Sequence, residues 1–277
     1  IEAVFGNYEK YGGALAALAV LAYALQLYMD FAGGINIVTG TAEMFGISLA
    51  PNFKRPYFAV SMTDFWHRWH ISLGDWMRDY LFYPFATSKP LMSLGKKLKN
   101  KSPYLARTLP AVLGNLVVFF IVGLWHGAKM SYIVWGLYNG IVLGISAMLA
   151  PVYKTLNAKF SKLVTSPFWH VVRVIRTFLI VCAGYFFDRA ETVLGAIRML
   201  HRAIVWPAFY QFTNGVWLEL GLNVQDFIFL GCSFGAFFFI SLYQEKVGSL
   251  RDWLEKQPTL VRWMILYGLM FFLIAFA

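Results

Sequence analysis

Apolar runs that approach the length of a membrane span recur along the whole chain, and they restrict its fold more than any other feature. An α-helix rises about 1.5 Å per residue, so about 20 apolar residues cross a bilayer core. Of the 277 residues 59% are hydrophobic and 14% charged, whereas a soluble domain has about 25% charged residues. This excludes a soluble single-core enzyme, a disordered chain and a disulfide-rich secreted module, and predicts an all-α, polytopic membrane protein. The apolar runs cover residues 12–29, 108–125, 131–150, 171–187, 227–243 and 260–277.

The basic residues lie mainly between these runs. The chain has 24 Lys and Arg against 14 Asp and Glu, a net charge of +10. Basic loops at 89–107 and 151–167 flank the pair of runs at 108–125 and 131–150. Short basic loops favour the cytoplasmic side of a membrane. We therefore expect both loops there, in contact with anionic lipid headgroups and not with nucleic acid.

Glycines at four-residue spacing occur in two of the runs. They are Gly136, Gly140 and Gly144 in one, and Gly231 and Gly235 in the other. Such spacing lets two membrane helices approach closely. We predict that these glycines pack helices and do not bind a ligand.

The domain organisation is predicted to be simple. No linker is long enough to separate domains, so residues 1–277 are expected to form a single membrane-embedded domain. Residue 1 is Ile and the last residues, FFLIAFA, stop inside an apolar run. We expect the sequence to be a fragment, with N-terminal helices and the extreme C-terminus missing.

Residues 63–85, TDFWHRWHISLGDWMRDYLFYPF, are too polar to face lipid along their whole length. Their polar side chains fall on more than one face of a helix, so we predict a helix that lines a wet cavity and not one that lies at the interface. Thr63 or Asp64 is expected to cap its start, and Pro84 to end it.

His67 and His70 would share a face of that helix, because they are three residues apart. One interpretation is a metal pair, but the chain has only 5 His, and we predict no metal site. The other is a polar cluster, in which His70 positions a substrate and Arg68 or Arg78 holds a carboxylate or phosphate. A structural network of Asp64, Arg68 and a histidine is compatible with that role.

His126 ends an otherwise apolar run, in the sequence GLWHG. A structural interpretation is an imidazole hydrogen-bonded to a backbone carbonyl at a helix end. Ionisable residues inside a membrane are costly and usually functional. A neutral imidazole accepts a proton from a hydroxyl nucleophile, which is the task of a general base.

The motifs around these residues resemble the membrane-bound O-acyltransferase family, specifically its bacterial polysaccharide branch. That branch includes alginate O-acetylase-like proteins and teichoic acid D-alanyl transfer proteins. The resemblance covers roughly residues 30–202. It rests on DFAGG at 30–34, PNFKRPY at 51–57, DFWHRWHISLGDWMRDYLFYP at 64–84, GLWHG at 123–127 and YFFDRAE at 185–191.

The resemblance implies a bundle of many helices around a buried tunnel, with an acyl donor arriving from one side and a hydroxyl acceptor from the other. It assigns the family's catalytic histidine to His126 and a second, motif-borne histidine to His70. The role of His67 stays open. Residues expected to line the tunnel or bind substrate are Trp125, Trp66, Trp69, Arg68, Arg78, Asp64, Asp30 and Asn115.

The predicted function is that of an O-acyltransferase in the bacterial inner membrane. We expect it to move a short acyl group, preferably acetyl, to a hydroxyl of an exported polysaccharide such as alginate, or of a cell-wall polymer. No bound cofactor is expected; the co-substrate is an acyl thioester, either acetyl-CoA or an acyl carrier protein. Other proteins of a wall-modification complex are further candidate partners.

Three alternatives stay open at this stage. The loop after Pro84 lacks the Gly-Gly-Asn-Arg stretch associated with the alginate type, so D-alanyl transfer to teichoic acid is one. A transporter or export channel with a buried His/Asp relay is another, although no inverted repeat is visible. The third is a non-catalytic scaffold in a wall-modification complex.

Overall fold

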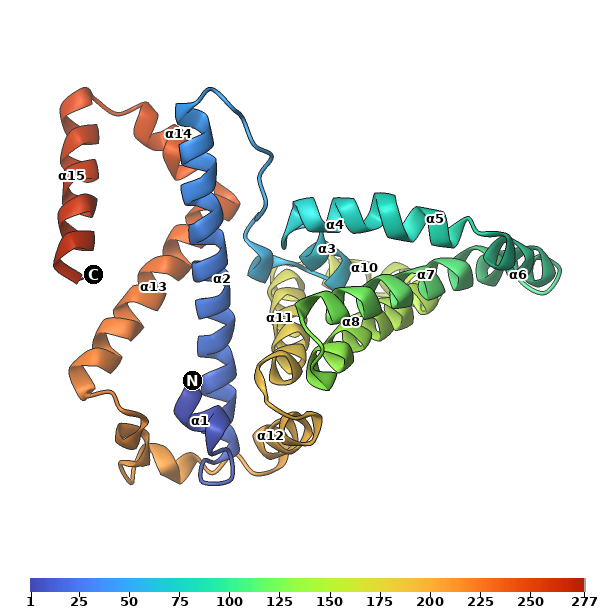
Figure 1. Ribbon diagram of the computed structural model, residues 1–277, viewed down its shortest axis with the longest axis horizontal. Helices are drawn as coiled ribbons and strands as arrows, with labels where there is room; N and C mark the ends of the chain where they lie inside the picture. Colours follow the sequence, from blue (N-terminus) through green and yellow to red (C-terminus); the bar gives the residue numbers. More distant parts are fainter. Residues whose placement is uncertain (277) are drawn as a thin grey trace. The chain divides into compact units, whose positions relative to one another are not determined.

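The computed structural model describes residues 1–276, in which every regular element is helical. Among these residues five helices are long and apolar enough to cross a membrane, so the prediction of an all-α, multi-pass membrane protein is confirmed. They are α2 (Gly13–Met44), α7 (Pro103–His126), α8 (Met130–Met148), α11 (Pro167–Arg189) and α13 (Val224–Lys246) (Figure 1).

The described chain forms two compact units, Ile1–Leu220 and a second that begins at Gly221. The second unit contains α13, α14 (Leu250–Glu255) and α15 (Thr259–Phe276), whose described side chains are mostly exposed. The remaining helices of the first unit are α1 (Glu2–Gly6), η1 (Pro56–Phe58), α3 (Met62–Trp66), α4 (Ile71–Met77), η2 (Arg78–Phe82), α5 (Tyr83–Ala86), α6 (Lys89–Lys99), α9 (Ala150–Lys159), α10 (Ser161–Val164), α12 (Val193–Val205), η3 (Phe209–Phe212) and η4 (Val216–Leu220).

Helix α2 is longer than its apolar run, because it continues through Asp30 and the glycine pair to Met44. The apolar run at 12–29 therefore marks only the first part of this helix. Its N-terminal half packs against α11 and α12, where Leu15 and Ala24 are fully buried. Farther along, the Phe31 ring lies 5.0 Å from that of Phe53, and this contact holds the chain segment after α2 against the helix.

The segment predicted as one helix over residues 63–85 is broken into α3, α4, the π-helical η2 and α5. The Ser61 side chain caps its start by accepting a hydrogen bond from the Asp64 amide at 3.1 Å, so the cap is neither Thr63 nor Asp64. Pro84 lies in the first turn of α5 and does not end the helical stretch. The helical stretch is continuous through Pro84, and the π-helical turn η2 lies directly before it, where proline removes a backbone donor from the helix.

Helices α7 and α8 form a tight hairpin (Figure 1). Gly127 ends α7 with φ 148°, a conformation that other residues rarely adopt. A Cβ atom on Gly123 would lie 2.6 Å from the Tyr132 carbonyl oxygen, and one on Gly136 would lie 2.2 Å from the Phe119 carbonyl oxygen. The two backbones therefore touch only because side chains are missing at these points.

The glycine prediction is confirmed for one series and not for the other. Added Cβ atoms on Gly140 and Gly144 would also meet side chains of α7 at 3.1 and 2.8 Å. By contrast, an added Cβ atom on Gly231 or Gly235 would meet no described atom within 4 Å beyond the backbone of its own helix, so their packing role stays a prediction.

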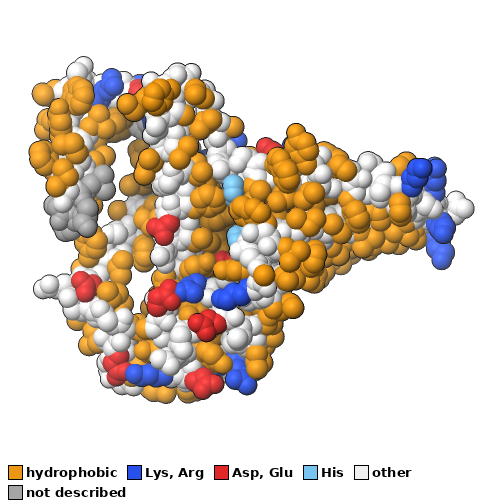
Figure 2. All heavy atoms as spheres, viewed as in Figure 1, with side chains coloured by type: hydrophobic (Ala, Val, Ile, Leu, Met, Phe, Trp, Pro, Cys, Tyr) orange, Lys and Arg blue, Asp and Glu red, His pale blue; other side chains and the backbone are white. Residues whose placement is uncertain are grey.

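The basic segments lie at the end of this hairpin that is remote from Gly127. Helix α6 precedes α7 and packs on it, while α9 and α10 follow α8. Figure 2 shows the hairpin surface as mainly hydrophobic, with basic side chains gathered at its tip. Because α7 and α8 run antiparallel, both basic loops lie at the same end of the hairpin; that this end is on the cytoplasmic side of the membrane stays a prediction. The exposed lysines of α6 and of the turn that follows it are Lys89, Lys96, Lys97, Lys99 and Lys101.

The close approach at Gly136 predicts a stability effect. Gly136→Ala should lower the free energy of unfolding of the detergent-solubilised protein by about 1–3 kcal/mol, because α7 and α8 must separate to admit the methyl group. Gly33→Ala is the matched control: nothing lies within 4 Å of its Cβ position, and alanine is the better helix former. Equal unfolding temperatures for the two variants would contradict the packing described.

Candidate active site

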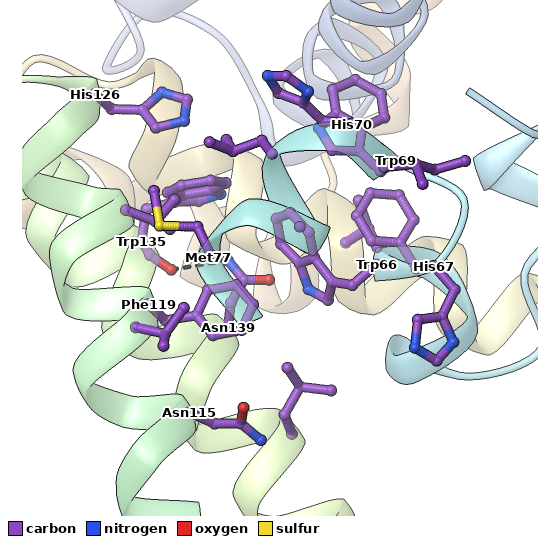
Figure 3. Close-up of a pocket in the computed structure, with 18 of the residues that line it drawn as sticks. Trp66, His67, Trp69, His70, Met77, Asn115, Phe119, His126, Trp135 and Asn139 are labelled. Carbon is purple, nitrogen blue, oxygen red and sulfur yellow. Dashed lines mark hydrogen bonds between the residues drawn. The ribbon is translucent and has the colours of Figure 1, made fainter. Parts of the chain in front are cut away.

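The first unit encloses a cavity of about 670 Å³ between α2, α4, α7, α8 and α11 (Figure 3). This volume lies within the range of ligand-binding pockets. The walls are mainly apolar and aromatic. His67, His70 and His126 all line this cavity, although 55 residues separate His70 from His126 in the chain.

His126 is the last residue of α7, and the turn at Gly127 leaves its side chain exposed at the rim of the cavity. Its ring centroid lies 4.8 Å from that of Trp135 and 5.1 Å from that of Trp125. The imidazole is thus held by aromatic contacts and stays accessible to a substrate that enters from outside.

His70 lies in the non-helical turn between α3 and α4, with φ 46° and ψ 53°. A residue other than glycine is uncommon in this left-handed region, and such residues cluster at functional sites. The predicted helix face shared by His67 and His70 does not exist, because α3 ends at Trp66. In Figure 3 the two imidazoles point in different directions, and His67 is exposed.

His70 and His126 lie on opposite sides of the cavity (Figure 3). The Trp125 centroid is 6.5 Å from that of His70 and 5.1 Å from that of His126. Burial, and to a smaller extent repulsion from His126, lowers the pKa of His70 below its usual value. His70 is therefore neutral at pH 7, since an imidazole with a lowered pKa binds its second proton only in more acidic solution.

The three tryptophans expected to wall the site all line the cavity. Trp69 is 8% exposed, and Trp125 is 59% exposed. The Trp66 ring centroid lies 4.9 Å from that of Phe119 and 6.2 Å from that of Trp135. Its indole Nε1 is buried without a hydrogen-bond partner among the described residues.

The other predicted site residues divide into two groups. Asn115 and Arg78 line the cavity, although Arg78 is exposed and is paired with Asp75 at 2.8 Å and Asp79 at 3.0 Å. Asp30 lies on α2 with an exposed side chain and is not among the lining residues.

Asp64 and Arg68 also lie outside the cavity lining and form a structural pair. The Arg68 Nε donates to Asp64 Oδ1 at 2.8 Å, and Asp64 Oδ2 accepts from the Val60 amide at 2.9 Å. This pair fixes the start of α3. It contains the Asp and Arg of the structural network considered from the sequence, but His70 is hydrogen-bonded to Asn52 instead.

Sequence reasoning missed Asp188, a buried carboxylate on α11 that lines the cavity and is 7% exposed. The Tyr23 hydroxyl donates to Asp188 Oδ2 at 2.6 Å. The carboxylate is also near enough to His126 for an electrostatic interaction. The signal was present in YFFDRAE, where an acid follows an apolar run, since such acids usually have a role. Asn52, the partner of His70, had no comparable signal.

No group of three or more His, Cys, Asp or Glu side chains within residues 1–276 is arranged to hold a metal ion. The cavity lining instead includes the imidazoles of His67, His70 and His126, the buried carboxylate of Asp188 and aromatic walls. Such a set can bind an organic substrate and transfer protons.

Comparison with known proteins decides the family. The sequence matches the membrane-bound O-acyltransferase family, MBOAT, over residues 8–187. The chain belongs to this family. The matched region includes His70 and His126 and all the residues that line the cavity except Asp188.

Three relatives illustrate the range of named activities in this MBOAT branch. A probable alginate O-acetylase of Pseudomonas fluorescens is 38% identical over 185 residues, 66% of this chain and 32% of the relative. A peptidoglycan O-acetyltransferase of Helicobacter pylori is 31% identical over 67% of this chain and 31% of its own. A teichoic acid D-alanyltransferase of Bacillus subtilis is 30% identical over 61% of this chain and 40% of its own. The matched region thus spans about a third of the length of these relatives.

The Tyr23–Asp188 hydrogen bond predicts a coupling between the two side chains. Tyr23→Phe should lower the free energy of unfolding by about 1–3 kcal/mol, because it leaves a buried carboxylate without its donor. In an Asp188→Asn background the same substitution should cost less, by at least about 0.5 kcal/mol. Denaturant unfolding of the four proteins measures this coupling, and equal costs in both backgrounds would contradict it.

Proposed function

We propose that the complete protein transfers a short acyl group from a thioester donor to a hydroxyl of an exported glycan or wall polymer, at the cavity between His70 and His126. The printed names of the relatives support this, because they describe O-acetylases and D-alanyltransferases of such polymers. Membership of this family favours acyl transfer over transport. The proposed location is the bacterial inner membrane, and the thioester is a CoA ester or a carrier-protein thioester.

The observation that carries the proposal is the meeting of His70 and His126 at one cavity. In the proposed reaction the acceptor hydroxyl attacks the thioester carbonyl carbon while His126 takes its proton. The tetrahedral intermediate then collapses, the C–S bond breaks, and the thiolate receives the proton from His126. A positioned general base contributes about 10²–10⁴-fold to such a step.

D-alanyl transfer is the second candidate, and Asp188 is the observation that favours it. A D-alanyl thioester carries an ammonium group, which a buried carboxylate would bind more strongly than an uncharged acetyl group. The chemical identity of the transferred acid therefore discriminates between the two candidates.

The test uses the full-length gene in a deletion host, with the acids released from wall and exported glycans by mild alkali measured at matched membrane levels. Wild type should restore the ester. His126→Ala should abolish it, and His70→Ala should reduce it. His201→Ala is the matched control, because His201 is exposed on α12 and is not a lining residue.

Either of two results would contradict the proposal. Full ester levels with His126→Ala would mean that His126 is structural. No ester with abundant wild-type protein would favour a transport or scaffold role. The released acid, acetate or D-alanine, decides between the two candidate reactions.

A further inference from the structure

A single oxygen atom, Asn52 Oδ1, gathers three hydrogen bonds beside the cavity. It lies 3.3 Å from His70 Nδ1, 3.1 Å from the Ser72 amide nitrogen and 3.1 Å from Ser72 Oγ. Asn52 is 8% exposed. A buried asparagine with this set of partners is not free to turn its amide group over.

These contacts determine which nitrogen of His70 carries the proton. A backbone N–H only donates, so the Asn52 atom bonded to the Ser72 amide must be the carbonyl oxygen of the side chain. That oxygen only accepts, so His70 Nδ1 must be the donor. A neutral imidazole has one N–H, and Nε2 is therefore left as a hydrogen-bond acceptor.

The backbone and two aromatic rings fix the imidazole in this orientation. The Ile71 amide donates to the backbone carbonyl oxygen of Asn52 at 3.0 Å, which ties the residue after His70 to the same asparagine. The Phe31 ring stands perpendicular to the imidazole at 4.7 Å, and Phe53 stacks on it at 6.4 Å. Rotation of the ring would break these contacts.

We infer that Asn52 is a positioning residue that holds His70 in the Nδ1–H form, and that His70 Nε2 accepts a hydrogen bond from a hydroxyl of the acceptor substrate. The inference rests on the proposed function and deepens it. It excludes oxyanion stabilisation by neutral His70, because an oxyanion requires a donor. His126 receives the proton of the hydroxyl that reacts, so the two imidazoles serve different hydroxyls, as a polyhydroxylated glycan provides.

The charges around His70 set how its protonation responds to pH. The titratable groups that share the cavity are Tyr23 on α2, His67, Asp75 and Arg78 around α4, His126 on α7, and Tyr185 and Asp188 on α11. Of these His126 acts on the pKa of His70, and it lowers that pKa together with burial. No carboxylate is hydrogen-bonded to His70 in the described part of the chain. A carboxylate introduced in place of the Asn52 amide would therefore raise the pKa of His70, whereas burial and His126 lower it.

The first test observes the proton directly and does not depend on turnover. Histidine-15N-labelled full-length protein is measured by NMR in detergent at neutral pH, with His70→Gln used to assign the signal. The expected result is a protonated Nδ1 and an unprotonated Nε2 on His70. Asn52→Ala should shift the signal toward the Nε2–H form. A wild-type Nε2–H form, or an unchanged signal in Asn52→Ala, would overturn the inference.

The second test uses the pH dependence of ester formation. Asn52→Asp keeps an accepting oxygen at the same place, but its carboxylate stabilises the imidazolium and raises the pKa of His70. Because neutral His70 is required, the acidic limb of the pH profile should move to higher pH by about 1–2 pH units. Ser72→Ala is the control, since it removes a hydrogen bond to the same oxygen and leaves the limb in place.

These outcomes separate the inference from the proposed function. If the acidic limb of the pH profile of Asn52→Asp coincides with that of the wild type, Asn52 is only structural. Full activity of His126→Ala would overturn the proposed reaction, while the NMR signal of His70 would still decide the role of Asn52.

Discussion

Backbone groups that leave a helix inside a membrane protein need partners within the protein, because lipid tails offer none. The chain between α2 and α4 meets this requirement by pairing with itself: the Lys54 amide donates to the Arg68 carbonyl oxygen at 2.9 Å, and the Ile71 amide to that of Asn52 at 3.0 Å. The Tyr57 hydroxyl donates to the Ala24 carbonyl oxygen at 2.5 Å and anchors the segment on α2. His70 therefore occupies a left-handed turn with a fixed place at the cavity. The opposite wall depends on the glycine-mediated contact of α7 with α8, which presents His126 at a helix end.

Much of this architecture is predictable from composition and spacing. Apolar runs locate the long helices because lipid demands about 20 apolar residues per span. The series Gly136, Gly140 and Gly144 predicts a tight helix contact, since backbones approach closely only where side chains are small. GLWHG and the tryptophan–histidine segment identify His126 and His70 as residues of interest. The fold brings His126 and His70 to one cavity. Without the resemblance, the sequence around each residue does not predict this meeting.

Local sequence rules fail where tertiary contacts override them. Helix α2 continues through Gly33 and Gly34 despite a cost of about 1 kcal/mol each; its buried residues, such as Leu15 and Ala24, all precede this pair. The helix expected over residues 63–85 breaks after Trp66, because Asn52, far away in sequence, supplies the hydrogen bonds of the turn. Asp64 and Arg68 satisfy each other and so leave the cavity, although their polarity suggested a place in it. Such long-range partners leave no periodic signal in the sequence.

The cavity between His70 and His126 is the proposed place of acyl transfer, and the roles of both histidines depend on it. The most direct measurement is a structure of the full-length protein with a non-hydrolysable thioether analogue of the acyl donor bound. We expect the acyl carbonyl carbon to lie between the two imidazoles, with the His126 ring nearest to the side from which a hydroxyl would attack. An analogue bound elsewhere, with this cavity empty, would contradict it.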